Sequence, residues 1–444
     1  MTESLSAQKA QSLRFVIPVT VENVVAVFVT LASSRITSTI SSSALAAIGM
    51  ATAVMQVVMA MFNMLTTGTG IRMARQVGAQ DRLGASDTVA QAMLLSWLLG
   101  GAVTALCVGC SGPLLRLLMP TAEEALFGEA VRYFRILMLS LPLYLIYATL
   151  GTVCRSCGNS RSPLVASIAL SVAQLLFSWI FVRLCRWEEL GAGLAFVVCR
   201  SLGAAILFVH ALRSHQHFEL HWKDIFRPHA ETLRAILRLG MPVSVEGVLV
   251  QLGYMLAGTM SIALGTFGAG VYQILNTLNN FITVPQTICS NVSLSMLGRL
   301  LGTGEEKQAR RTGRRVWLAG ILSVSLLSAV ALLLARPLCG MYSADPAAVD
   351  AGSSLLWLLV VMDIAGISIN GVDPQLRAGG DVTFVMIESL LGVWAIRLPL
   401  TWLFCMRLDM GVFGIFLANT VSLYFRAALG LIRLHGHKRI HRRI

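Results

Sequence analysis

The sequence predicts an all-α integral membrane protein with twelve transmembrane helices in two six-helix lobes, related by a pseudo-two-fold axis along the membrane normal. Its composition is the first reason. Of the 444 residues, 56% are hydrophobic and 13% are charged, and the mean hydropathy is +0.72, whereas a soluble domain is about a quarter charged. The second reason is that long apolar runs recur along the whole chain in two similar halves.

Each apolar run is long enough to cross a bilayer, because about 20 apolar helical residues span a hydrocarbon core of about 30 Å. In the first half the expected spans are residues 15–33, 45–67, 88–109, 132–152, 163–183 and 190–212. In the second half they are residues 239–263, 268–297, 316–335, 353–374, 382–404 and 411–432. Residues 1–12 show no basic, apolar and cleavage-site series, so we expect no removed signal peptide.

An internal repeat divides the chain. A shift of 224 positions aligns LRFVIPVTVE with LRLGMPVSVE and places Glu22 on Glu246, and a shift of 222 positions places Arg155 on Arg377. Each half has an even number of spans, so both halves have the same orientation in the membrane. Two such bundles that face each other would form a central cleft near the bilayer midplane, as alternating access by rocking halves requires.

The repeat and the charge pattern predict the domain organisation. We expect an N-terminal lobe at 1–212, a cytoplasmic connector at 213–236 and a C-terminal lobe with a basic cytoplasmic tail at 237–444. With both termini in the cytoplasm, most of the 35 Lys and Arg residues fall in cytoplasmic segments. The net charge of +13 is therefore typical of membrane topology and anionic lipid, and we expect no nucleic-acid partner.

Four groups of residues together resemble the multidrug and toxic compound extrusion (MATE) family. They are the Pro-x-x-x-Glu that opens each half, the turns GAQDRLGA and LGTGEEKQA, the LRAGGD turn, and RLPL at 397–400. The resemblance covers nearly the whole chain. It implies an antiporter in a bacterial inner membrane, with two six-helix lobes, that exchanges Na⁺ or H⁺ for organic, often cationic and amphipathic, compounds.

The sequence departs from the family pattern at the end of the first span. Many relatives carry an acidic residue there, where this chain has Ser33, Ser34 and Arg35. A first-lobe cation site built on that acid is therefore in question. Arg299 also stands where relatives commonly have glutamine.

Four carboxylates inside predicted spans are the candidates for coupling to a cation and for substrate binding. They are Glu22, Glu246, Asp363 and Glu388. A charge in the middle of a spanning helix costs roughly 2.5 to 3.5 kcal/mol, so each needs a partner, a proton or a function. A buried carboxylate can bind H⁺ or Na⁺ on one side of the membrane and release it on the other. We expect a Na⁺ site, if there is one, at Glu246 or Asp363.

These carboxylates differ in how they relate to the repeat. Glu22 and Glu246 occupy matched positions, so an alternative role is to satisfy backbone groups that the nearby prolines leave free. At the 222 shift Asp363 has Leu141 opposite and Glu388 has Ala166, so both break the symmetry. Coupling confined to one lobe would give this pattern. Asp373 is expected in the following cytoplasmic turn.

Polar amides in two spans are candidates for lining the cleft. They are Gln273, Asn276 and Asn280 in the eighth span, and Gln56 and Asn63 in the second. Their alternative role is hydrogen bonding between neighbouring helices. Asn279 belongs to the same set of amides, and Arg397 in the eleventh span has no partner that the sequence identifies.

Other function classes have less support from these residues. There is no GxxxxGK[ST] phosphate loop, so we expect neither ATP hydrolysis nor a required ATPase partner. No paired catalytic motif indicates an enzyme, and we expect no cofactor beyond the coupling ion. A lipid-linked saccharide flippase is the nearest alternative, and a membrane receptor or enzyme is the alternative from another class. The expected partners are a small organic substrate and the lipid bilayer.

Overall fold

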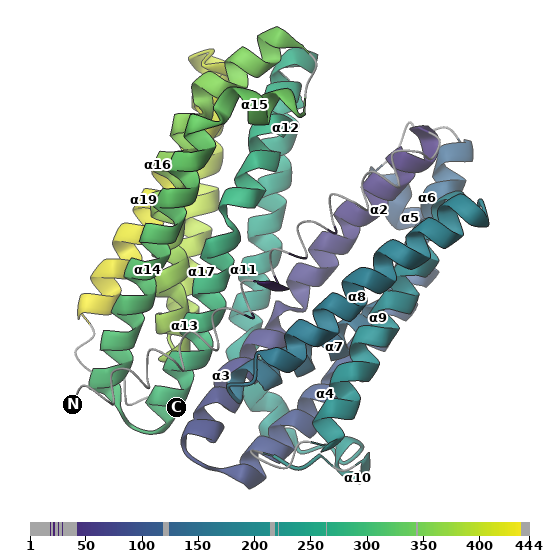
Figure 1. The fold of residues 1–444 in the computed structure, drawn as a ribbon, viewed down its shortest axis with the longest axis vertical. Helices are drawn as coiled ribbons and strands as arrows, with labels where there is room; N and C mark the ends of the chain where they lie inside the picture. The colour runs from purple at the N-terminus through teal and green to yellow at the C-terminus, as the bar shows by residue number, and fades with distance from the viewer. Residues whose placement is uncertain are drawn as a thin grey trace. The chain divides into compact units, whose positions relative to one another are not determined.

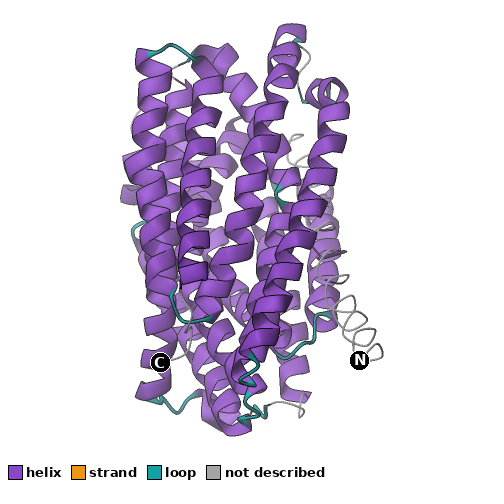
Figure 2. Ribbon diagram, turned by 90° about the vertical axis from the view of Figure 1, so that its left-hand side faces the viewer, coloured by secondary structure: helices purple, strands orange, loops and turns teal. Residues whose placement is uncertain are grey.

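The structure is a computed structural model, and the residues that it describes are almost entirely helical (Figure 2). The described residues are 18, 21, 22, 25, 29, 42–118, 124–213, 218–220, 222–262, 264–342 and 345–436. Most of the first predicted span, including Ser33, Ser34 and Arg35, lies outside them, as does the basic tail from residue 437. Within the described residues there is no strand, as the composition predicts.

The chain divides into two compact units, residues 1–244 and 245–444, and the division falls inside helix α11 (Ala230–Ile262). The lobe limits at 212 and 237 stay a prediction. Unit 1 contains the helices coloured purple to teal in Figure 1. They are α2 (Ser42–Met61), α3 (Asn63–Gly78), α4 (Arg82–Gly109), α5 (Ser111–Leu118), α6 (Glu124–Leu139), α7 (Leu141–Ser156), α8 (Arg161–Ser178), η1 (Trp179–Leu184), α9 (Glu188–Arg213), α10 (Trp222–Ile225) and the first half of α11.

Unit 2 contains the second half of α11 and the helices that follow it, coloured green to yellow in Figure 1. They are α12 (Gly265–Ile282), α13 (Val284–Gly302), α14 (Glu306–Leu333), α15 (Ala335–Gly340), α16 (Pro346–Ala378), α17 (Val382–Leu390), η2 (Leu391–Arg397), α18 (Leu398–Trp402), η3 (Leu403–Arg407) and α19 (Gly411–Gly436). The three segments labelled η are π-helical turns, which often occur at functional sites.

The helices account for the spans that the sequence predicts. Among the described residues, 9 helices are long and apolar enough to cross a membrane, and α6 with α7, bent by 40°, makes up to 10. The predicted eighth span corresponds to two helices, α12 and α13, which meet at Thr283. Pro285 lies in the first turn of α13, where a proline costs no hydrogen bond.

Helix α16 lies at the centre of unit 2. The most apolar stretch of α16 is 61% buried, against 22% for α14, and α12, α13, α14 and α19 all pack on α16. Its start is fixed by Asp345, whose carboxylate accepts a hydrogen bond from the Ala347 amide, and by Pro346 in the first turn. It ends at Ala378, two residues before Gly380, which has φ +91°.

The repeat is visible in the backbone at the ends of two helices. Gly380 and its counterpart Gly158, 222 positions earlier, both take the left-handed conformation, with φ of 91° and 82°. Glycine adopts this conformation without the strain that a side chain would add. The same turn therefore ends α7 in unit 1 and α16 in unit 2.

Candidate functional site

A cavity of about 260 Å³ lies among the helices of unit 2. Its walls come from α11, α12, α13, α16, η2 and α19, so nearly every long helix of the unit contributes to it. The lining contains three carboxylates and three arginines, and most of its remaining polar groups are amides. Those charged residues are Glu246, Asp363, Asp373, Arg377, Arg397 and Arg426.

One face of α16 supplies much of the polar lining. Asp363, Gly366, Asn370, Asp373 and Arg377 all line the cavity, and they follow one another at intervals of four and three residues. Residues three and four apart lie on the same side of a helix. This face runs for about 20 Å, at about 1.5 Å per residue. The expectation that Asp373 lies in the turn after the span was wrong, because α16 continues to Ala378 and buries Asp373.

Asp363 is the most enclosed acid of the cavity wall, with 1% of the residue exposed. One carboxylate oxygen accepts a hydrogen bond of 2.7 Å from the Gln286 amide of α13. The Gln286 carbonyl oxygen in turn accepts a bond of 3.2 Å from Asn370. The other oxygen of Asp363 is buried and has no hydrogen-bond donor among the described residues. Asp363 therefore has one oxygen held in place and one free to bind.

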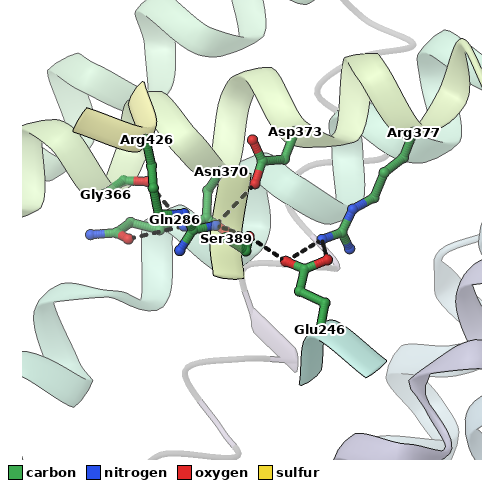
Figure 3. A network of polar contacts seen from close by, with 8 residues as sticks. All are labelled: Glu246, Gln286, Gly366, Asn370, Asp373, Arg377, Ser389 and Arg426. Carbon is green, nitrogen blue, oxygen red and sulfur yellow. Dashed lines mark hydrogen bonds and ion pairs between the residues drawn. The ribbon is translucent and has the colours of Figure 1, made fainter. Parts of the chain in front are cut away.

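Glu246 is part of a network that crosses the unit (Figure 3). Arg377 donates to both of its carboxylate oxygens, at 3.0 and 2.9 Å. Ser389 donates to Glu246 at 2.7 Å and accepts from Arg426 at 2.6 Å. Arg426 also contacts Asp373, at 3.4 Å. Both oxygens of Glu246 are thus occupied by donors from the protein.

Glu388 lies beside this network and is buried, with 1% of the residue exposed. Neither of its oxygens has a donor among the described residues, and the same holds for one oxygen of Asp373. Both carboxyl groups lie beside Gly430. A β-carbon added at this glycine would be 3.4 Å from an oxygen of Glu388 and 3.9 Å from an oxygen of Asp373. Neighbouring carboxylates repel each other when both are charged, so a bound cation or proton would relieve the pair.

Arg397, at the end of η2, is 3% exposed and lines the cavity. Its guanidinium lies over the ring of Tyr254, 4.0 Å from the ring centroid. Its Nε and Nη1 atoms have no acceptor, and among the described residues it forms no ion pair. The sequence identified no partner for Arg397, and none is present in the described part of the chain.

Unit 1 has the counterpart of one of these contacts. Arg155 donates to both oxygens of Glu22, each at 3.3 Å. Glu22 and Arg155 are the repeat equivalents of Glu246 and Arg377. The same ion pair therefore occurs in both units, which points to a structural contribution that the duplication kept.

The amides predicted to line the cleft are found partly in the cavity wall and partly on the surface of their units. Asn276 lines the cavity, as does Asn279, one of whose atoms is a buried acceptor without a donor. Gln273 and Asn280 on the same helix are exposed and do not line it. In unit 1, Gln56 and Asn63 are exposed too. Their cleft-lining role stays a prediction.

Sequence reasoning missed several residues of the cavity wall. Gln286, Asn370, Arg377 and Arg426 all contribute polar groups to it. The spacing of polar residues along 363–377 could have identified the α16 members. Gln286 gives no such signal, because the sequence does not distinguish it from the other polar residues of α13, such as Thr287 and Ser290. Within the described residues, no group of three or more His, Cys, Asp or Glu side chains could hold a metal ion.

Comparison with known proteins decides the family. The MatE family model matches residues 18–180 and again residues 242–403, so it covers most of the chain and matches once in each half. The chain belongs to the MATE family. The two matches begin 224 positions apart, which confirms the repeat seen in the sequence.

Two relatives align over nearly all of this MATE chain at low identity. The uncharacterized transporter YisQ of Bacillus subtilis is 22% identical, covering 93% of this chain and 91% of its own. The probable multidrug resistance protein NorM of Thermotoga maritima is 20% identical, covering 97% and 93%. MATE proteins are transporters and not enzymes, and this chain is a multi-pass membrane protein of that family.

Solved MATE structures share its fold. The outward-facing conformation of a multidrug resistance MATE family transporter of the MOP superfamily matches with a TM-score of 0.87 and 20% identity, over 97% of this chain and 95% of that one. A MOP superfamily transporter from Pyrococcus furiosus matches with a TM-score of 0.85 and 20% identity, over the same shares. The MATE fold of twelve helices in two lobes is therefore the fold of this chain, as the sequence predicts.

Proposed function

We propose that this MATE protein is a secondary antiporter of the bacterial plasma membrane that exports organic, amphipathic compounds, cations among them, in exchange for Na⁺ or H⁺. Its family and its relatives named for multidrug resistance support efflux. Alternating access of the two lobes would carry the compound outward while the coupling ion moves inward. Both termini would lie in the cytoplasm.

The observation that carries the proposal is the free oxygen of Asp363 in the wall of the unit 2 cavity. A buried carboxylate without a partner is much more costly as a bare ion than with a bound cation or proton. Its other oxygen is held by Gln286, which fixes the position of the carboxylate. Asp363 would bind the coupling ion from outside and release it into the cytoplasm. The emptied site could then take up cargo for transport outward.

The other predicted acids differ from Asp363 in their surroundings. Glu246 has donors from Arg377 and Ser389 on its oxygens, so a cation could reach it only after Arg377 moves. Glu388 and its neighbour Asp373 form a second place for a proton or cation. We rank Asp363 first because it lines the cavity and Glu388 does not.

Flux in liposomes tests this proposal. Purified protein in liposomes would be supplied with an imposed Na⁺ or H⁺ gradient, and movement of a fluorescent organic cation would be followed. We expect wild-type protein to drive the dye with one of the two gradients. In Asp363→Asn, gradient-driven flux should fall to the leak of protein-free liposomes. The neutral amide cannot bind and release H⁺ or Na⁺ as the carboxylate does.

Asp350→Asn is the matched control. Asp350 lies on the same helix, and its side chain is 56% exposed in an ion pair with Arg336. Exposed ion pairs contribute at most about 1 kcal/mol, so this variant should transport normally. Unchanged flux in Asp363→Asn would move coupling to Glu388, Glu246 or Glu22, and Glu388→Gln is the next variant to compare. No flux under either gradient, with a wide set of cations, would favour the flippase alternative.

A further inference from the structure

Arg397 presents a buried positive charge for which the described chain supplies no negative partner. Removing one ion from a buried pair is strongly destabilising, so an unpaired buried ion is expected to have a function. The guanidinium has five N–H donors, and here Nε and Nη1 have no acceptor. The protein keeps this charge although the residue is only 3% exposed.

The other two arginines of the cavity are engaged by the protein itself. Arg377 binds both oxygens of Glu246. Arg426 binds Ser389 and Asp373. Arg397 is held instead by an aromatic face, with Tyr254 at 4.0 Å. Stacking fixes the plane of a guanidinium and leaves its N–H edge available for a planar, two-oxygen acceptor.

The groups that line the cavity with Arg397 suit an aromatic ligand. Tyr254, Tyr272 and Phe416 are among its lining residues, and the rings of Tyr272 and Phe416 are 5.7 Å apart. Asn276, one turn after Tyr272 on α12, adds an amide. Rings pack favourably against other rings at such separations. This combination of a fixed cation, aromatic walls and an amide matches an aryl carboxylate.

We propose that the Arg397 end of the unit 2 cavity binds the carboxylate of an aromatic cargo molecule. The inference rests on the proposed export function and specifies its substrate class as compounds that carry a carboxylate on an aromatic body. Zwitterions fit best, because the cavity also contains the acid Asp363. At about 260 Å³ the cavity is smaller than the usual ligand pocket of about 300 to 1,000 Å³. It would therefore enclose only part of a larger cargo molecule, with the carboxylate at Arg397.

A matched pair of dyes tests the proposal. The free acid of a simple rhodamine dye is a zwitterion with a benzoate group, and its methyl ester has the same rings without the carboxylate. Binding of each dye to the full chain in detergent would be measured by fluorescence anisotropy, with no ion gradient. We expect Arg397→Gln to weaken binding of the free acid about tenfold, equivalent to about 1.4 kcal/mol. Binding of the ester should change less than about twofold, a fraction of that energy.

Two further variants make the result specific. Arg397→Lys keeps the charge but loses the two-pronged geometry, so its affinity for the free acid should lie between those of wild type and Arg397→Gln. It also serves if Arg397→Gln does not fold, which ester binding and the thermal melt will reveal. Arg407→Gln is the control, because Arg407 is exposed, stacks on Trp402 and does not line the cavity. It should bind both dyes as wild type does.

Three results would overturn the proposal. They are wild-type protein that binds the ester but not the free acid, variants of Arg397 that bind the free acid normally, and variants that lose both dyes equally. The antiport proposal fails separately. If the Arg397-dependent preference for the free acid is present but neither gradient drives flux, the binding site stands and the antiport mechanism does not.

Discussion

Asp363 and Arg397 lie on different helices of unit 2, yet they line one cavity, and each has polar atoms that no described neighbour satisfies. Burying an ion without a partner costs several kcal/mol. A protein that only needed a stable core would replace such residues with apolar ones. The retained charges are therefore best explained by ligands, a cation at Asp363 and an anionic group at Arg397.

Glu246 has a different role at the residue scale, because its ion pair with Arg377 is complete. The side chains are 9% and 21% exposed, so the pair is largely shielded from water. We predict that Glu246→Gln destabilises the protein by roughly 3 kcal/mol, because it leaves Arg377 charged and without its partner. The measurement is the melting temperature of the purified protein in detergent.

Two comparisons check this prediction. Arg336→Gln breaks an ion pair whose side chains are 73% and 56% exposed, and it should lower the melting temperature little. Combining Glu246→Gln with Arg377→Gln should cost less than the sum of the two single changes, since no unpaired charge remains. A melting temperature unaffected by Glu246→Gln would refute the structural role of the pair.

At the scale of the element, α16 carries its polar groups on one face, and a glycine in that face sets the position of Gln286. A β-carbon at Gly366 would lie 2.8 Å from the Gln286 carbonyl oxygen and 3.0 Å from its amide nitrogen. We predict that Gly366→Ala displaces Gln286 from Asp363 and reduces gradient-driven flux, although alanine favours a helix by about 1 kcal/mol over glycine. The flux assay in liposomes measures this effect.

Gly352 on the same helix is the control for that substitution. A β-carbon there would have its nearest neighbour, the Cys339 sulfur, at 3.4 Å, an ordinary contact distance. Gly352→Ala should therefore raise the melting temperature slightly and leave flux unchanged. Equal flux in the two alanine variants would show that the contact between Gln286 and Asp363 is not needed for transport.

Sequence alone predicted the location of α16 and its central acid, but not the extent of its polar face. The apolar run predicts a span that ends near residue 374, and it places Asp373 in the turn that follows. The helix instead continues past Pro374, which removes only one hydrogen bond close to the C-terminal end. The partners of Glu246 could not be predicted, because Arg377 and Ser389 reach it from helices far away in the sequence.

At the scale of the whole molecule, apolar length and the repeat were enough to predict the fold. Both can be read from the sequence without knowledge of the packing, and each predicted span from the second to the twelfth corresponds to one helix or to successive helical segments. The break of the eighth span at Thr283 was not predicted, because its polar and apolar residues continue in a helical pattern on both sides. How the lobes enclose a central cleft stays a prediction.

The predicted orientation can be tested with cysteines on either side of α4. Cys110 follows this helix and is exposed, and Leu83 in its first turn is 86% exposed. In a chain whose other cysteines are serine, a membrane-impermeant maleimide should label Cys110 in intact cells. A Leu83→Cys variant that lacks Cys110 should be labelled only after the membrane is opened, because cytoplasmic segments carry the positive charge.

The opposite labelling pattern would place the N-terminus outside and reverse the predicted topology. Labelling of both positions from the same side would mean that α4 does not cross the membrane. Control labelling in opened membranes shows that both cysteines are reactive in the folded protein, so that a negative result in intact cells is due to the membrane.

The ion pair that occurs in both units also indicates which features of the chain came before the duplication of its half. A contact shared by both repeats, Glu22 with Arg155 and Glu246 with Arg377, was present in the ancestral half before it was copied. Asp363 and Arg397 are matched by Leu141 and Leu175, so these differences arose after the copy, by gain in one half or loss in the other. By this order of events, the asymmetry between the halves at these two positions is younger than the ion pair that they share.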